Sequence, residues 1–244
     1  MHSASVLRYV LFVLSVLLPL SASALPQRIR ERNHNLTSSH CPDFCAGTVF
    51  QSDYYVCGDP RLGPVELPSK FPLSNQLQTY SRFGSLCPGD FLKKWAPPGN
   101  ASAKYVYPPE DGFALDTKSQ PIMGRARLPV GAKLDRFGSE YGKFLSPLGA
   151  PYIARALPPS NLNAAPGAQY PFNYHVYEVS KEFEVGMGPI APWFEQPGMG
   201  TQYLADKQVL QLIKEGFLRR LDESEYDEAD EYSNNYTPGP RDAK

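Results

Sequence analysis

The sequence predicts an α+β protein in which a sheet dominates, preceded by a loop-rich N-terminal extension that disulfides hold together. Three features of the chain lead to this prediction. First, 25 Pro and 19 Gly among 244 residues favour short strands, turns and long loops over a helical bundle. Second, short apolar segments separated by Gly and Pro follow Gly112, as strands separated by turns do. Third, all 4 cysteines lie in the first half of the chain.

The region after Gly112 contains the candidate strands and the clearest candidate helix. Strands are expected at 126–130, 133–137, 152–157, 174–179 and 201–204. Within the fourth of these, Tyr174 and Val176 face one side of the sheet, whereas Tyr177 and Val179 face the other. A helix is expected at 207–221, with Asp206 as its N-cap and apolar residues along one face. A shorter helix is expected at 75–80 in the extension.

The first 24 residues have the pattern of an export signal. Arg8 supplies a positive charge, residues 10–20 are apolar, and Ala22 and Ala24 flank Ser23 in the small-residue pattern that signal peptidase cleaves. A retained membrane anchor is the alternative, but the apolar run is short and interrupted by Pro. We therefore expect a mature protein without a membrane span that begins near Leu25 and is secreted, then either released or kept at the cell surface.

Cysteines and glycosylation sequons agree with export. An even number of cysteines in a secreted chain predicts two disulfides, and three pairings stay open. Zinc binding is the alternative, although the spacing of these cysteines is not that of a zinc finger or ribbon. The cysteines are Cys41, Cys45, Cys57 and Cys87. The N-x-S/T sequons, which predict glycosylation, are at Asn35, Asn100 and Asn235.

Charge and motif content argue against several classes of function. The chain has 24 basic and 25 acidic residues, which gives a net charge of −1. Because there is no basic excess, electrostatically driven nucleic-acid binding is not expected. The chain lacks the GxGxxG, GxxxxGK[ST], HExxH and GxSxG patterns. The sequence fingerprints of Rossmann, P-loop, zincin and serine-hydrolase sites are therefore absent.

Conventional acid–base chemistry has few candidate residues. His175 is the one histidine in a predicted core element, where such a residue is more often a hydrogen-bonded core side chain than a base. A pair of carboxylates for glycoside hydrolysis stays open, because sequence does not give the separation that this chemistry requires. The carboxylates in question are Asp135, Glu140, Glu178, Glu182, Glu184 and Glu195.

Two long stretches carry a more specific signal. Residues 128–163 contain LDRFG-x3-G-x-FLSP followed by Y-x-AR-x-LP, and residues 174–204 contain GPIAPWF-x-QPG-x-GTQY. In this order the motifs resemble the tuberculosis necrotizing toxin (TNT)-type domain, specifically its fungal surface NAD glycohydrolases. The resemblance covers about residues 112–221 and implies a TNT-like, sheet-dominated fold. It divides the chain into a signal peptide (1–24), a cysteine-containing extension (25–111), a catalytic domain (112–221) and an acidic tail (222–244).

The resemblance implies an enzyme that hydrolyses the nicotinamide–ribose bond of NAD, and commonly of NADP, with no cofactor for the chemistry. This chemistry is plausible without an acid–base pair, because nicotinamide leaves a cationic pyridinium as a neutral molecule and needs no protonation. The barrier lies in an oxocarbenium-like ribosyl cation. The site must therefore hold the diphosphate and surround the developing cation with oriented dipoles.

The resemblance also implies roles for individual residues. Arg136 and Arg155 would contact the diphosphate, for which the rigid, permanently charged guanidinium is suited, and Arg155 would be needed for catalysis. Phe137 and Phe144 would form aromatic walls, although toxin-like members have Tyr at the latter position. Gln202 would be the polar catalytic residue near the ribose. Gln196 is its nearby competitor.

The acidic segment after Leu221 has two interpretations. A charge run is usually a solvated tail, and this one lacks the EF-hand pattern. The resemblance instead implies a regulatory calcium site near the C-terminus, with Asp227 and Glu228 as expected ligands. It further implies a homodimer, in which the extension would be the dimerisation arm. The other functions left open are an ADP-ribosyl transferase or cyclase, and a non-enzymatic secreted module that binds glycans.

Overall fold

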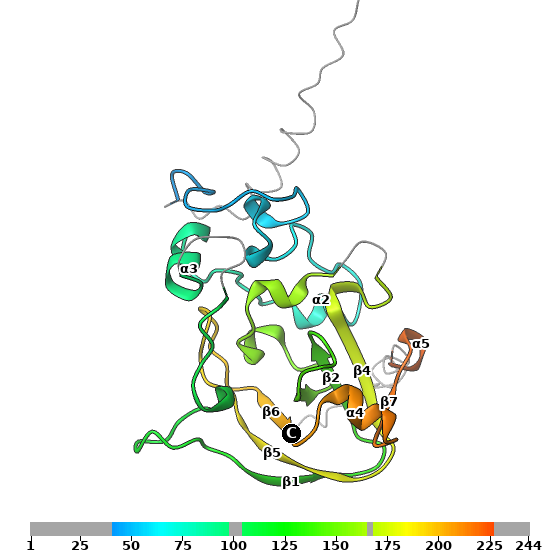
Figure 1. The fold of residues 1–244 in the computed structure, drawn as a ribbon. Helices are drawn as coiled ribbons and strands as arrows, with labels where there is room; N and C mark the ends of the chain where they lie inside the picture. The colour runs from blue at the N-terminus through cyan, green and yellow to red at the C-terminus, as the bar shows by residue number, and fades with distance from the viewer. Residues whose placement is uncertain (1–40, 98–103, 165–167, 227–244) are drawn as a thin grey trace, which may run out of the picture.

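A computed structural model describes residues 41–97, 104–164 and 168–226. Its strands form one antiparallel seven-stranded sheet in the order β1-β5-β6-β3-β2-β4-β7 (Figure 1). The strands are β1 Gly124–Leu128, β2 Lys133–Phe137, β3 Phe144–Pro147, β4 Tyr174–Val179, β5 Phe183–Pro189, β6 Thr201–Ala205 and β7 Leu218–Arg220. The sheet-dominated α+β class is thereby confirmed. In the described part of the chain, no helix is long and apolar enough to cross a bilayer.

Helices in the described residues are few and short. The α-helices are α2 Leu73–Gln76, α3 Pro88–Trp95, α4 Val209–Lys214 and α5 Glu223–Tyr226. The 3₁₀ helices are η1 Val56–Gly58, η2 Pro60–Leu62, η3 Glu110–Gly112, η4 Tyr152–Arg155, η5 Pro159–Leu162 and η6 Pro171–Asn173. The frequency of Pro and Gly accounts for this pattern, because both residues interrupt longer helices.

Four of the predicted strands are confirmed. β2 and β4 have the predicted bounds, β6 extends one residue further, and β1 both begins and ends two residues earlier than expected. The predicted alternation along β4 also holds. Tyr174 and Val176 pack in one hydrophobic cluster, whereas Tyr177 and Val179 pack in another. The two faces of this part of the sheet therefore belong to two different cores.

Two other predicted elements were wrong, and a third was displaced. The strand expected at 152–157 is instead the 3₁₀ helix η4, followed by Ala156 in the left-handed region at φ 47°. The helix expected at 207–221 ends at Lys214, and Gly216, with φ 74°, redirects the chain into β7. The N-cap of α4 is Gln208 and not Asp206. In the extension, α2 lies at 73–76 and not at 75–80.

Two disulfides in the extension confirm the prediction from the cysteine count. Cys41 is bonded to Cys87, and Cys45 is bonded to Cys57. Around them lies an aromatic and aliphatic cluster that includes Phe91 of α3. In Figure 1 this part of the chain, blue to blue-green, lies at one end of the molecule.

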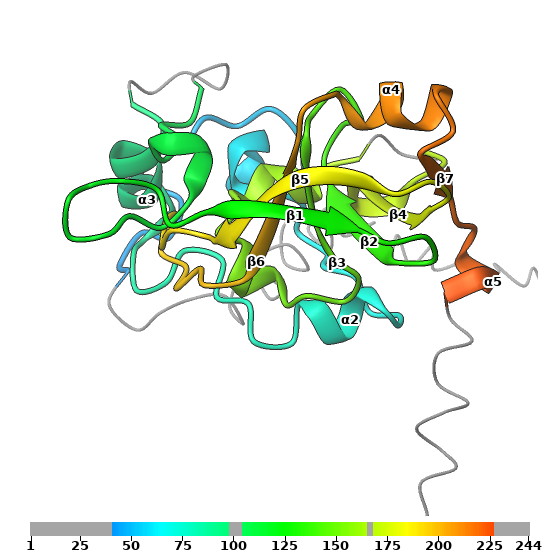
Figure 2. The ribbon, with the colours of Figure 1, turned by 90° about the horizontal axis from the view of Figure 1, so that it is seen from below.

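The described part of the extension packs directly against the sheet. On one face, Val209 and Leu212 of α4 share a hydrophobic cluster with Leu134 of β2 and Tyr177 of β4. Figure 2 shows α4 near β7 at this side of the sheet. On the other face, Leu77, which follows α2, shares a hydrophobic cluster with Phe137 of β2 and Tyr152 of η4. The extension thus covers one face of the strands that carry two of the predicted site residues.

Candidate active site

A cleft opens where β2 and β3 separate. These strands pair only at Leu134↔Pro147 and Asp135↔Ser146, and beyond that point β2 pairs with β4 alone. The cleft has a volume of about 380 Å³. Its lining residues are Tyr107, Pro108, Asp111, Gly112, Arg136, Phe137, Phe144, Arg155, Ala156, Leu157, Asn161, Ile190 and Gln202.

All five residues that the resemblance assigned to catalysis or substrate binding line this cleft. They are Arg136, Phe137, Phe144, Arg155 and Gln202. They come from β2, β3, η4 and β6, so the fold gathers side chains that lie up to 66 residues apart in the chain. Gln196 is not among the lining residues, because its buried amide donates to the backbone carbonyl of Ser81 at 2.6 Å.

Arg136 spans the gap between the separating strands. Its Nε donates to the Ser139 carbonyl at 2.9 Å, and its Nη1 donates to the Phe144 carbonyl at 2.7 Å. Within the described residues, Nη2 has no hydrogen-bond partner. Burial lowers the pKa of Arg136, but a guanidinium in a protein stays protonated. The side chain is therefore a held cation, and one of its nitrogens makes no hydrogen bond to the described part of the chain.

Gly142 gives the Arg136 guanidinium its space. A Cβ at this glycine would lie 2.0 Å from Nη2 of Arg136 and 2.5 Å from its Cζ. Such distances are far below van der Waals contact, so any side chain at position 142 would displace the guanidinium. The glycine in the LDRFG-x3-G-x-FLSP motif thus has a steric explanation.

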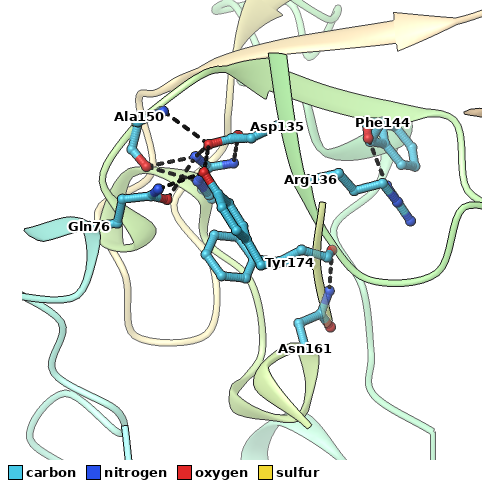
Figure 3. A network of polar contacts seen from close by, with 10 residues as sticks. Gln76, Asp135, Arg136, Phe144, Ala150, Asn161 and Tyr174 are labelled. Atoms are coloured by element: carbon cyan, nitrogen blue, oxygen red, sulfur yellow. Dashed lines mark hydrogen bonds and ion pairs between the residues drawn. The ribbon is translucent and has the colours of Figure 1, made fainter. Parts of the chain in front are cut away.

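Arg155 belongs to a buried polar network on the other side of β2. Its Nη1 and Nη2 donate to the two carboxylate oxygens of Asp135 at 2.6 and 2.8 Å, and both side chains are buried. Nε and Nη2 also donate to the Ala150 carbonyl. In Figure 3 the Asp135 side chain points toward Gln76 and Tyr174, whereas that of Arg136 points toward Phe144.

The network reaches into the extension. Gln76 of α2 donates from Nε2 to the Tyr174 hydroxyl at 2.8 Å and accepts from Nη2 of Arg155 at 3.3 Å (Figure 3). The Tyr174 hydroxyl donates to Asp135 at 2.9 Å, and the Gly149 amide donates to the same carboxylate oxygen at 3.0 Å. Arg155 is consequently held by protein acceptors at all three of its nitrogens while it lines the cleft.

Gln202 is oriented by a strained turn. Its Nε2 donates to the Asp111 carbonyl at 2.9 Å, and within the described residues its Oε1 has no hydrogen-bond partner. Asp111 and Gly112 both have positive φ, at 53° and 81°. This turn fixes the amide so that its oxygen stays free to accept a hydrogen bond or face a positive charge.

A second charged group lies behind Arg136. Glu140 accepts hydrogen bonds from Arg220 and from the Tyr177 hydroxyl. Burial raises the pKa of Glu140, but these hydrogen bonds outweigh burial and leave the pKa below its usual range. Buried His175, whose Nδ1 lies 3.8 Å from Glu140, has its pKa lowered by burial.

The carboxylates considered for a glycosidase pair all have cationic partners. Asp135 pairs with Arg155, Glu140 with Arg220, Glu178 with Arg219, Glu182 with Arg127, Glu184 with Arg125, and Glu195 with Lys94. Of the six, only Asp135 lines a small branch of the cleft, of about 40 Å³. These carboxylates are engaged with arginine and lysine.

Asp111 and Tyr107 line the cleft but were missed by the sequence analysis. Both lie before the region covered by the resemblance, or at its edge, in a Pro-rich stretch without a motif. Asn161 was missed as well, and its Nδ2 donates to the Phe137 carbonyl at 3.2 Å. A usable signal was the pair Asp111 and Gly112, which is typical of a turn with positive φ.

Several predicted sites lie outside the described residues. They are the calcium ligands Asp227 and Glu228 and the sequons at Asn35, Asn100 and Asn235. Within the described residues, no group of three or more His, Cys, Asp or Glu side chains is placed to hold a metal ion. The calcium and glycosylation predictions therefore stay predictions.

Comparison with known proteins identifies the family. Residues 127–221 match the family model described as tuberculosis necrotizing toxin. The chain is 64% identical over 231 residues to the conidial surface nicotinamide adenine dinucleotide glycohydrolase nadA of Aspergillus fumigatus. That alignment covers 94% of this chain and 97% of the relative. The chain belongs to this TNT-type NAD glycohydrolase family.

A solved structure is also similar to this family member. The tuberculosis necrotizing toxin, in complex with its immunity factor, aligns with a TM-score of 0.47 and 19% sequence identity. The alignment covers 75% of this chain and 96% of that chain.

Proposed function

We propose that this chain is a secreted or surface-retained enzyme that hydrolyses the nicotinamide–ribose bond of NAD and NADP. The products are nicotinamide and ADP-ribose, or the phosphorylated form of ADP-ribose. The observation that carries this proposal is the 64% identity, over nearly the whole chain, with a conidial surface NAD glycohydrolase. A cleft lined by arginine, phenylalanine and glutamine side chains supports it, because NAD offers a diphosphate, aromatic rings and a reacting ribose.

In the proposed mechanism, Arg136 contacts the diphosphate. Support comes from its Nη2, which has no protein partner among the described residues while Nε and Nη1 hold the side chain in place. A cation held in this way loses little conformational entropy on binding, so more of the charge–charge attraction appears as affinity. Phe137 and Phe144 form the apolar wall that shields the reacting bond from bulk water.

Arg155 contributes in a more constrained way. Its three nitrogens donate to Asp135, Ala150 and Gln76. Any contact of Arg155 with the diphosphate must therefore come from a guanidinium whose charge Asp135 already neutralises. We propose that Arg155 meets the diphosphate at the floor of the cleft and also fixes the position of β2 relative to η4. Its loss should therefore reduce both catalysis and stability.

Gln202 acts at the ribose. The hydrogen bond from its Nε2 to Asp111 leaves Oε1 as the dipole end that faces the cleft. As the C1′–N bond breaks, positive charge develops on the ribosyl group, and an oriented amide oxygen stabilises it more than it stabilises the substrate. The neutral amide is also less costly to desolvate than a carboxylate.

The proposal extends to the organisation of the chain. Residues 1–24 are the signal peptide, 25–111 the extension, 112–221 the catalytic domain and 222–244 the acidic tail. The contacts of Gln76 and Asp111 support an extension that completes the active site. We further propose a homodimer, glycosylation at the three sequons, and a regulatory calcium bound by Asp227 and Glu228. Calorimetry on the Asp227→Asn, Glu228→Gln protein tests the calcium ligands, because undiminished calcium binding would contradict them.

Product analysis tests the activity. The full chain is secreted from a host that cleaves signal peptides, incubated with NAD, and its products are separated by chromatography. We expect nicotinamide and ADP-ribose in equal amounts. Nicotinamide with a different ADP-ribosyl product would indicate a transferase or a cyclase. Intact NAD, with calcium present and the disulfides formed, would contradict the proposal and favour a glycan-binding module.

A further inference from the structure

Few charged residues line the cleft, and they differ in the hydrogen bonds and ion pairs that they make. Among the described residues that line it, Arg136, Arg155 and Asp111 are the only ones with charged side chains. The two arginines are held by carbonyls or by Asp135. Asp111 is exposed, and its carboxylate has no hydrogen bond or ion pair within the described residues. Among the described residues, it is the one acidic residue that lines the main cleft, and no cation of this part of the chain pairs with it.

Asp111 also lies next to Gln202. The hydrogen bond of 2.9 Å from Nε2 of Gln202 to the Asp111 carbonyl places the backbone of this residue beside the amide proposed to act at the ribose. The next residue in the turn is also close, because a Cβ at Gly112 would lie 3.9 Å from Oε1 of Gln202. The turn at Glu110–Gly112 therefore carries both the group that orients Gln202 and a free carboxylate.

The charge distribution of the substrate matches this arrangement. NAD carries negative charge on its diphosphate and a positive charge on its nicotinamide ring, at opposite ends of the nicotinamide ribose. We propose that the Asp111 carboxylate is the anionic subsite of the cleft, which binds the cationic end of NAD and stabilises the ribosyl cation. This inference deepens the proposed function and rests on it.

The bond changes explain what such a carboxylate does. When the C1′–N bond breaks, its electron pair leaves with the nitrogen, so the ring becomes neutral and the positive charge moves onto the ribosyl C1′ and ring oxygen. Water then forms the new C1′–O bond and loses its proton to solvent. A carboxylate beside the ribose attracts the charge in both places. It forms no covalent bond in this scheme.

The backbone at Asp111 permits a clean substitution. Its φ of 53° lies in the left-handed region, which Asp and Asn enter more readily than other residues with side chains. Asp111→Asn therefore removes the charge while keeping the turn and its carbonyl. Glu110→Gln is the matched control, because Glu110 is the neighbouring exposed carboxylate, has φ 50°, and does not line the cleft.

Two measurements test the inference in the full secreted chain. The first is kcat and KM for NAD, and the second is the ratio of Kd values for NADH and for a carbocyclic NAD analogue that cannot be hydrolysed. Both ligands carry the diphosphate, but only the analogue has a cationic ring. For Asp111→Asn we expect kcat to fall at least about tenfold, with the preference for the cationic ring lost. Glu110→Gln should behave like the wild type in both.

The outcomes separate this inference from the activity itself. If the wild type does not cleave NAD, the proposed function fails, while the ratio of Kd values still decides whether Asp111 recognises the cationic ring. If Asp111→Asn keeps the wild-type ratio, the anionic subsite is refuted, even where kcat has fallen through a disturbed Gln202. A wild-type ratio together with an unchanged kcat would overturn the inference altogether.

Discussion

A Cβ on Gly142 would lie 2.0 Å from Nη2 of Arg136, so the position of the guanidinium depends on the absence of a side chain at residue 142. Gly142 does not have positive φ, and alanine can therefore adopt its backbone conformation. The clash involves the end of a flexible side chain. The clash is relieved by movement of the Arg136 side chain and not of the backbone, so the substitution disturbs the cleft more than the fold.

Gly142→Ala should therefore impair NAD hydrolysis more than folding. We expect kcat/KM to fall at least about tenfold, mainly through KM, because the displaced guanidinium would miss the diphosphate. The melting temperature should change little. Gly124→Ala is the control, since a Cβ at Gly124 meets no atom within 4 Å. Unchanged kinetics in Gly142→Ala would show that the observed position of Arg136 is not required.

The buried pair of Asp135 and Arg155 predicts a large effect on stability. Among the described residues, Arg155→Met would leave the Asp135 carboxylate with only the Tyr174 hydroxyl and the Gly149 amide, in a site where the carboxylate is fully buried. Breaking such a pair costs about 3–5 kcal/mol of unfolding free energy. Chemical denaturation measures this loss.

Two further variants separate charge burial from shape. Asp135→Asn with Arg155→Met should recover part of the stability lost in Arg155→Met alone, because no uncompensated buried charge remains. Arg127→Met, which breaks an exposed pair with Glu182 at 3.3 Å, should have a much smaller effect. Equal losses in the exposed and buried variants would contradict this interpretation.

Strands could be predicted from the sequence where apolar residues recur between turn residues. The apolar residues of β4 fall on both faces, Tyr174 and Val176 on one and Tyr177 and Val179 on the other, and those of β2, Leu134 and Phe137, also face two cores. β5 does alternate, with Phe183, Val185 and Met187 on one face, but its two glycines weaken the strand signal, and β3 has only four residues. In η4 the apolar residues of YIAR are typical of a strand, but the flanking prolines and left-handed Ala156 impose a turn.

The site was only partly predictable for a related reason. Arg136, Phe137 and Gln202 lie in motifs, and motifs can be read from a single chain. Asp111 and Gln76 contribute through long-range contacts, to residues 91 and 79 positions away. Such contacts depend on how the extension packs against the sheet, which local patterns in the sequence do not encode.

His175 predicts how stability depends on pH. Burial lowers its pKa below the ordinary value of 6.5, although Glu140 opposes this shift and Arg136 and Arg220 add to it. The unfolded chain therefore binds a proton on His175 at higher pH than the folded chain does. Stability is retained above about pH 6.5 and is lost as the pH falls toward the folded pKa.

Denaturation at two pH values tests this prediction. Between about pH 7.5 and pH 5.5, the wild type should lose more unfolding free energy than His175→Gln. Glutamine keeps a polar partner for Asn173, which lies 3.2 Å from Nε2 of His175, but it does not titrate. The other histidines are common to both proteins and cancel in the comparison. Identical pH dependence in the two proteins would rule out His175 as the source.

The turnover of Gln202→Ala decides whether this cleft cleaves NAD with Gln202 at the ribose. Nicotinamide release by the wild type, Gln202→Ala and Gln211→Ala is measured at saturating NAD. Gln211 is the control because it lies on the exposed surface of α4, bonded to Glu215. We predict that kcat falls about a hundredfold or more in Gln202→Ala, with KM little changed, and stays at the wild-type value in Gln211→Ala. A Gln202→Ala protein that releases nicotinamide at the wild-type rate would contradict the role of Gln202 at the ribose.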